Sequence, residues 1–477
     1  MKKTGDEYLD SEEFRELLAT YEEAVSTGQP VFLDADELSE IADYYQMNEQ
    51  TDKADEAINM ALSLSPGAIM PLTYKIHEAL YYNKVEEAEA YLDQIIETDE
   101  PDYIYDKTEI MLAKGQVDEA DQMLQELLQE LPADEVQDFV VDVANIFQEN
   151  GLNKKALEWM QRSTHEETPD YKELMARTLF GLGKYKDSER LYNELIDTNP
   201  FSKRYWNALA STQFMREDYQ GSVQSSEYAL AIDPQDPDGL ISKANGLFRL
   251  ENYEEAAKYY QRYEEIVDND DFSLLHHATC LLNTGHGDEG LDLLKRAATV
   301  ACSEPYTDDN PSPFIADIFE ELAFALSERG MTDEAMAYLN KTDALDCDHI
   351  QMTIVKGHIL LAAGQYAEAE QMYQKAIMDS QTPDQAFLRV AVSVYDNRYV
   401  ETAYKMMKTY FTIVPPNNRD GYAYMALCCY DLKLHDEFLH YLLEACQRNP
   451  HECRMVLSHL FPEEVLPENY YDYMVSS

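Results

Sequence analysis

The chain has 477 residues, 45% of them apolar, so it is long enough and apolar enough to bury an extensive core. Its 92 acidic and 37 basic residues leave a formal net charge of −55, which argues against nucleic acids and anionic membranes as general partners and favours a basic or mixed-charge protein. No apolar run is long enough for a membrane helix, and acid stands where a signal peptide carries its apolar segment, so we expect a cytoplasmic protein.

The first predicted element is an amphipathic helix over residues 7–27, EYLDSEEFRELLATYEEAVST. A small residue then returns about every 34 residues, at Ala42, Ala144, Ala176, Ala210, Ala244, Ala278, Ala323, Gly357, Ala391 and Ala426, with weaker members at Ile76 and Thr108. Twelve residues after each member a second position recurs, at Ala54, Ala88, Ala120, Ala156, Ser188, Ser222, Ala256, Gly290, Ala335, Ala369, Ala403 and Phe438. We expect these small residues to let two helices approach closely.

Each repeat therefore predicts two helices joined by a turn. Trp206, Leu209 and Ala210 share one face of a first helix, and Pro234 closes the second helix of the same repeat. The turn often carries glycine, which readily adopts the left-handed conformation that ends a helix. These glycines are Gly115, Gly151, Gly183, Gly285, Gly330 and Gly364.

This period and pattern resemble the tetratricopeptide repeat family, whose Trp, Leu, small, Ala and Pro positions are matched by Trp206, Leu209, Ala210, Ser222, Ala229 and Pro234. The resemblance covers roughly residues 35 to 450. It implies an all-α, right-handed superhelical solenoid of about twelve helix-turn-helix repeats with capping segments at both ends. The predicted parts are a cap (1–34), repeats 1–8 (35–300), a Pro-rich insertion (301–316), repeats 9–12 (317–450) and a C-terminal cap (451–477).

The middle of the chain is where the acidic background fades. Residues 171–264 hold 12 basic and 15 acidic residues, against 11 and 42 in residues 1–170 and 14 and 35 in residues 265–477. If the first small residue of a repeat is position 8, the resemblance implies that positions 2, 5, 9 and 12 line a concave groove. The predicted peptide-binding residues in this window are Arg177, Phe180, Arg204, Asn207, Phe214, Asn245, Phe248 and Arg249. Alternatively, the three phenylalanines pack neighbouring repeats together.

Some members of the family clamp the C-terminal carboxylates of heat-shock chaperones with a lysine at position 5 and an asparagine at position 9. Here those positions of the corresponding repeat hold Glu173 and Arg177, and Asp238 stands where that clamp has a lysine. The pattern therefore argues against a chaperone tail and leaves a differently arranged site that reads carboxylates or amides.

The insertion at 301–316, ACSEPYTDDNPSPFIA, contains Pro305, Pro311 and Pro313, which forbid a continuous helix. We expect a surface loop with a modest kink; a hinge between repeats 8 and 9 is the alternative. Just before it, residues 285–290 read GHGDEG and match the glycine pattern of dinucleotide sites, but they follow a predicted helix and fall on an interhelical turn. No cofactor is expected there.

The C-terminal half carries all seven cysteines, without a CxxC pair, which favours reduced thiols. Its histidines and cysteines, such as His435, His440 and Cys446, do not have the spacing of a zinc motif, so no metal is expected. The sequence also lacks the motifs of common catalytic sites.

The prediction is a non-enzymatic scaffold that binds an extended peptide segment of a partner in its groove. An acidic holdase for a basic client is the alternative, and a regulated or metal-dependent enzyme is less favoured.

Overall fold

A computed structural model gives the structure of residues 11–48, 50–133, 135–164, 167–303, 306–307, 310–462 and 464–476. These described residues contain 27 α-helices and no strand. They form two compact units, unit 1 ending at Arg216 and unit 2 beginning at Glu217. The prediction of an all-α helical repeat solenoid is confirmed.

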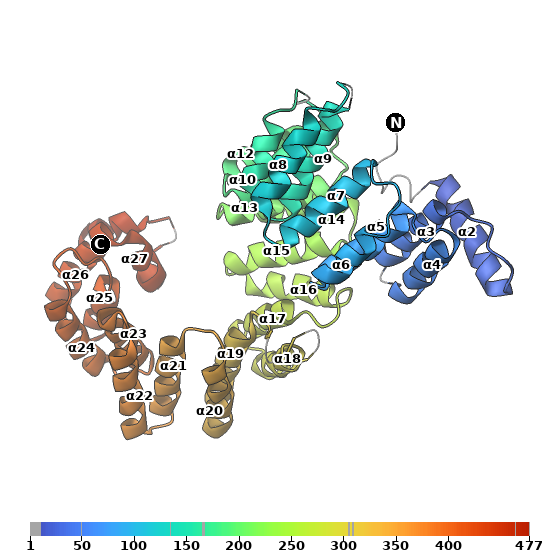
Figure 1. Ribbon diagram of the computed structural model, residues 1–477. Coiled ribbons are helices and arrows are strands. Elements are labelled where there is room, and N and C mark those ends of the chain that lie inside the picture. The colour runs from blue at the N-terminus through green and yellow to red at the C-terminus, as the bar shows by residue number, and fades with distance from the viewer. Residues whose placement is uncertain are drawn as a thin grey trace. The chain divides into compact units, whose positions relative to one another are not determined.

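Unit 1 is built from successive helices that lie side by side as pairs (Figure 1). The first and second helices of five repeats pack as α3 with α4, α5 with α6, α7 with α8, α9 with α10, and α11 with α12. The helices are α2 (Glu12–Thr27), α3 (Ala35–Met47), α4 (Thr51–Leu64), α5 (Ile69–Tyr81), α6 (Val85–Leu92), α7 (Pro101–Ala113), α8 (Val117–Leu128), α9 (Val136–Glu149), α10 (Asn153–Met160), α11 (Pro169–Gly181), α12 (Tyr185–Thr198) and α13 (Lys203–Met215).

Unit 2 continues the same plan, with six further pairs from α15 and α16 to α25 and α26. Its α-helices are α14 (Tyr219–Ile232), α15 (Pro237–Arg249), α16 (Tyr253–Glu264), α17 (Asp271–Asn283), α18 (Gly287–Val300), α19 (Ile315–Ser327), α20 (Thr332–Lys341), α21 (His349–Ala362), α22 (Tyr366–Asp379), α23 (Pro383–Asp396), α24 (Val400–Ile413), α25 (Tyr422–Asp431), α26 (His435–Arg448), α27 (Pro450–Leu457) and α28 (Tyr470–Ser476). Three short 3-10 helices are η1 (Thr342–Ala344), η2 (Ser458–Leu460) and η3 (Pro467–Asn469).

The small residues of the repeat are buried, as the pattern predicts. Ala176 and Ser188 are both 0% exposed, and the Ser188 Oγ donates a hydrogen bond to the Ala176 carbonyl at 2.8 Å. A larger side chain at either position would separate the two helices. Gly357 shows the same constraint, because a Cβ atom there would lie 2.6 Å from the Tyr373 ring.

The turns between paired helices adopt the left-handed conformation expected of their glycines, for example at Gly183 with φ 72°. The sequence pattern missed the turns without glycine. Asn83, Glu251, Arg398 and Lys433 occupy the matching place with φ between 56° and 67°. The repeat therefore imposes this conformation even on Glu251, Arg398 and Lys433, whose residue types rarely adopt it.

The insertion lies within unit 2, and Pro305 lies outside the described residues. Its described part contacts α17 through buried Ser312, whose Oγ donates a hydrogen bond to the carboxylate of Asp271, and through Phe314, whose ring centroid is 5.1 Å from that of Phe272. Helices α18 and α19 pack directly on each other across the insertion.

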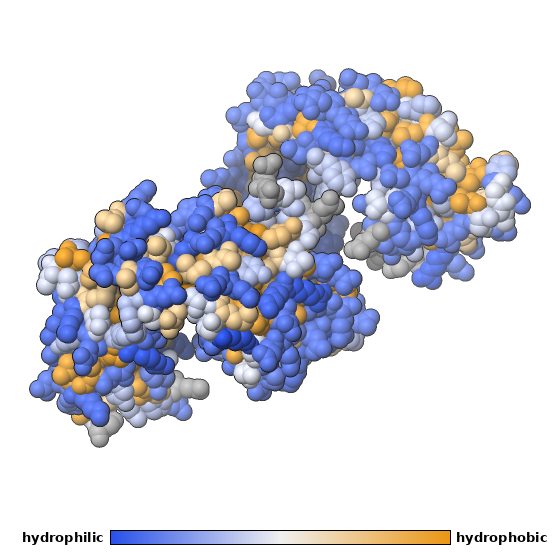
Figure 2. All heavy atoms as spheres, turned by 90° about the horizontal axis from the view of Figure 1, so that it is seen from below, coloured by the Kyte–Doolittle hydropathy of each residue, from blue (hydrophilic) through white to orange (hydrophobic). Residues whose placement is uncertain are grey.

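The first and last helices cover apolar surface at the two ends of the repeat series. In unit 1, α2 buries Phe14 and Tyr21 against the core of α3 and α4. In unit 2, the segment after α26 buries Phe461 and Tyr470, whose rings stack with centroids 3.9 Å apart. Figure 2 shows that hydrophilic side chains cover much of the visible surface, as expected for a chain of charge −55.

Candidate peptide-binding pocket

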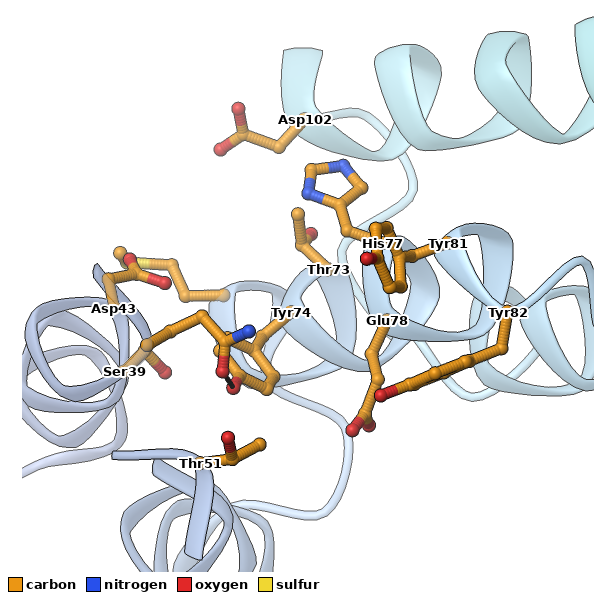
Figure 3. Close-up of a pocket in the computed structure, with 12 residues that line it drawn as sticks. Ser39, Asp43, Thr51, Thr73, Tyr74, His77, Glu78, Tyr81, Tyr82 and Asp102 are labelled. Atoms are coloured by element: carbon orange, nitrogen blue, oxygen red, sulfur yellow. Dashed lines mark hydrogen bonds between the residues drawn. The ribbon is translucent and has the colours of Figure 1, made fainter. Parts of the chain in front are cut away.

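A cavity of about 530 Å³ opens on the first helices of repeats 1 to 3 in unit 1. Side chains from α3, α5 and α7 converge on it, with Thr51 contributed by α4 (Figure 3). The lining residues are Ser39, Asp43, Gln46, Thr51, Met70, Thr73, Tyr74, His77, Glu78, Tyr81, Tyr82 and Asp102.

Most of this lining lies on the stripe that the family resemblance assigns to the groove. Position 5 provides Ser39 and Thr73, and position 9 provides Asp43 and His77. Helix α5 packs against both α3 and α7, so equivalent positions of successive first helices come together although they are far apart in the chain. The cavity is therefore a product of repeat stacking.

One wall of the cavity is organised around the imidazole of His77. Its Nε2 atom lies 3.3 Å from an Asp106 carboxylate oxygen and 3.2 Å from one of Glu109, both on α7. The Thr73 hydroxyl donates to the other Asp106 oxygen at 2.6 Å. Hydrogen bonds to these two carboxylates raise the pKa of His77 to about 10, so the ring is a cation at neutral pH.

Two further carboxylates reach the cavity from the flanking helices. Figure 3 shows Asp43 on α3 and Asp102 on α7, both to one side of Thr73 and His77 of α5 in this view. Neither makes an ion pair within the part of unit 1 that the structure describes. The Asp43 side chain is open to solvent, yet protein surrounds its carboxyl group closely enough for desolvation to raise its pKa to about 6.

Tyrosine rings supply the apolar part of the lining. The Tyr74 hydroxyl donates to the Gln46 side chain at 3.0 Å, which connects α5 to α3. Tyr81 and Tyr82 are 84% and 59% exposed, and their rings meet edge to face with centroids 5.2 Å apart. Large aromatic surfaces left in water beside a cavity are typical of interaction sites.

Unit 2 has cavities on the same helix surfaces. One of about 460 Å³ is lined by Phe248, Phe272, Leu275, His276, Thr279, Phe314, Asp317, Glu320 and Glu321. Burial raises the pKa values of Glu320 and Glu321. Another, of about 340 Å³, lies on α19, α21, α23 and α25 and includes Gln351, Ile354 and His358 at positions 2, 5 and 9 of their repeat.

The residues predicted from the sequence divide between the two units, and each group is described by itself. In unit 1, Arg204 forms an ion pair with Glu173, and Arg177 lies 3.7 Å from Glu149 and 3.4 Å from the Asn145 side-chain oxygen. Acidic neighbours therefore compensate both arginines. In unit 1, the positive charge of Arg177 and Arg204 is therefore offset by carboxylates of the same unit.

The remaining predicted residues of unit 1 lie on α11 and α13. Phe180 is half-buried and packs edge to face on Tyr185, with centroids 5.4 Å apart. Asn207 is buried and Phe214 is half-buried on α13.

In unit 2, the Asn245 side-chain oxygen accepts a hydrogen bond from Tyr260 at 2.6 Å, and Arg249 donates to the Tyr219 hydroxyl at 2.8 Å. Phe248 packs on Tyr253 as Phe180 packs on Tyr185, and it also lines the 460 Å³ cavity. It thus both packs between helices and contributes to a cavity wall.

Comparison with models of known protein families identifies the repeat. Two tetratricopeptide repeat models match the chain, one over residues 174–237 and one over residues 351–378. The chain contains tetratricopeptide repeats. No curated protein matches it.

Several solved structures resemble parts of this tetratricopeptide repeat protein. PilW, described as a widely conserved type IV pilus biogenesis factor, is 16% identical, with 46% of this chain and 98% of PilW covered and a TM-score of 0.39. YrrB, described as a TPR protein with an unusual peptide-binding site, is 20% identical, with 42% and 95% covered and a TM-score of 0.33. MamA from Desulfovibrio magneticus RS-1 is 13% identical, with 35% and 97% covered and a TM-score of 0.34.

Sequence reasoning missed the pocket of repeats 1 to 3 because it followed the loss of negative charge in repeats 5 to 7. The signal was present: positions 2, 5 and 9 of the first three repeats include Asp43, His77 and Asp102. Among the described residues, the structure shows no group of three or more His, Cys, Asp or Glu side chains placed to hold a metal ion. Within those same ranges, no helix is long and apolar enough to cross a membrane.

Proposed function

We propose that this tetratricopeptide repeat protein is a non-enzymatic, cytoplasmic scaffold that holds an extended segment of a partner protein against the first helices of its repeats. The observation that carries the proposal is that cavities in both units are lined by positions 2, 5 and 9 of successive first helices. Helices packed about 10 Å apart place three such surfaces over about 20 Å, which suits about six residues of extended chain.

A test is binding of the full chain to a fluorescein-labelled, mixed-sequence heptapeptide library, followed by fluorescence anisotropy. Met70→Trp and Thr279→Trp each place a bulky ring in a cavity and should weaken binding severalfold. Gln122→Trp and Gln261→Trp place the same ring on exposed second-helix surfaces and serve as matched controls. Equal binding by all four variants and the wild type would place the peptide elsewhere, and no binding at all would refute the proposal.

A holdase for a basic client is the second candidate, and the net charge of −31 over residues 1–170 favours it. It predicts that the full chain suppresses aggregation of reduced lysozyme at low ionic strength and loses this effect at high salt, because salt screens exposed charges. Suppression that does not change between low and high salt would count against it.

A further inference from the structure

We propose that the pocket on α3, α5 and α7 selects a basic side chain, that of lysine or arginine, from the bound segment. The inference rests on the proposed function and adds the chemistry of one recognised residue. At position 5, where the family's carboxylate clamp has lysine, this pocket has Ser39 and Thr73, and at position 9, where the clamp has asparagine, it has Asp43 and His77. The pocket therefore lacks the lysine with which that clamp holds a carboxylate.

The charges in the pocket favour a cation. Asp43, Glu78 and Asp102 enter it from three different helices, and its lining includes neither lysine nor arginine. Its one basic side chain, His77, is already held by two carboxylates, so this cluster is itself negative overall.

The three carboxylates differ in whether a lysine of this chain already forms an ion pair with them. Glu78 accepts a hydrogen bond from the Lys75 ammonium group at 2.7 Å, and the same ammonium group bonds Asp55 at 2.7 Å. Within the described part of unit 1, neither Asp43 nor Asp102 forms an ion pair with a lysine or arginine, although the His77 cation attracts Asp43 electrostatically. An incoming ammonium or guanidinium group would therefore meet carboxylates from α3 and α7 that no lysine or arginine holds within the described part of unit 1.

The partial desolvation of Asp43 strengthens this attraction. Charges interact more strongly in the lower effective dielectric of a concave wall than at a convex surface, where exposed ion pairs contribute little. The acidic background of residues 1–170, with 42 acidic and 11 basic residues, would also raise the rate at which basic segments reach the pocket.

The tyrosines supply apolar surface along which the stem of a basic occupant can lie. Lys84 places its ammonium nitrogen 5.7 Å from the centroid of Tyr82, and Lys75 does the same over Tyr74 at 5.7 Å. The chain's own lysines thus already contact two of the three pocket tyrosines, whereas the third, Tyr81, is 84% exposed. The aliphatic stem of a lysine or arginine can lie along these rings and Met70 while its charged end reaches the carboxylates.

The test measures anisotropy of the full chain with labelled heptapeptide libraries in which uncharged residues surround a fixed central residue. The central residue is lysine, arginine, leucine, glutamate or citrulline, which has nearly the shape of arginine but no charge. We expect lysine and arginine libraries to bind about tenfold more tightly than leucine and citrulline libraries, since Asp43 and Asp102 contribute about threefold each. The comparison of arginine with citrulline needs no protein variant.

The double variant Asp43→Asn with Asp102→Asn should lose this preference. Glu86→Gln with Glu119→Gln, exposed on second helices, removes the same charge and should retain it within about twofold. Two results would overturn the inference and leave the scaffold proposal standing. One is peptide binding without a preference for arginine over citrulline, and the other is a preference that persists in the Asp43→Asn, Asp102→Asn variant. No binding by any library would overturn both.

Discussion

Replacing Asp121 with alanine should destabilise unit 1 substantially. Asp121 lies on α8 with only 9% of its side chain exposed. Its carboxylate accepts hydrogen bonds from the Lys155 ammonium group at 2.6 Å, the Trp159 indole N–H at 2.8 Å and the Gln125 amide at 3.0 Å. Burial raises the pKa of Asp121, but these hydrogen bonds outweigh burial and hold the pKa below its usual value.

The expected change in the free energy of unfolding follows from the hydrogen-bond acceptor that Trp159 and Lys155 each lose. Trp159 is 0% exposed, so its N–H would be left without a partner, at a cost of about 1 to 3 kcal/mol. Lys155 keeps 26% side-chain exposure and can rehydrate, which limits its part to about 1 kcal/mol. We expect Asp121→Ala to lower the free energy of unfolding by about 2 to 4 kcal/mol, and Asp121→Asn by less because its amide oxygen still accepts from Trp159.

The assay is urea unfolding of the full chain in a Trp206→Phe background, where Trp159 becomes the only tryptophan and its fluorescence reports on unit 1. The stabilisation should be present above pH about 4 and lost as the pH falls through the lowered pKa of Asp121. An Asp121→Ala change within about 0.5 kcal/mol of the background, or an Asn variant as damaging as the Ala variant, would refute this reasoning.

Three further outcomes follow. Hydrogen bonds raise the pKa of His77 to about 10, so the stabilisation that the His77 cation provides should be complete below pH about 6.5 and lost as the pH rises toward 10. A difference in Tm between wild type and His77→Gln that stays constant over this pH range would contradict this prediction. Gly357→Ala should lower Tm despite the better helix propensity of alanine, because the alanine Cβ would clash with the buried Tyr373 ring. An unchanged or raised Tm would show instead that the ring can move aside. Phe461→Ala removes a buried ring stacked on Tyr470 and should cost about 3 kcal/mol, seen as faster proteolysis after α26; wild-type cleavage rates would disprove it.

Much of the fold was predictable because helix packing leaves a periodic trace in the sequence. Ala176 and Ser188 must be small for two helices to touch, so their spacing indicates the repeat from the sequence alone. The turns were predictable only in part. Glu251 and Arg398 adopt the conformation expected of glycine because the packing of the helices on either side fixes the path of the chain.

The sequence by itself determined the helix pairs and their period, and the family resemblance predicted which stripe of each first helix lines a groove. Tertiary structure decided which residues of that stripe come together at a cavity. Arg204 is conspicuous in the sequence, yet the fold pairs it with Glu173. Asp43 and Asp102 are two acids among 92, yet stacking brings them to one cavity beside exposed tyrosines. The reason is physical: local periodicity fixes which way a side chain points, whereas its charge partners come from other helices.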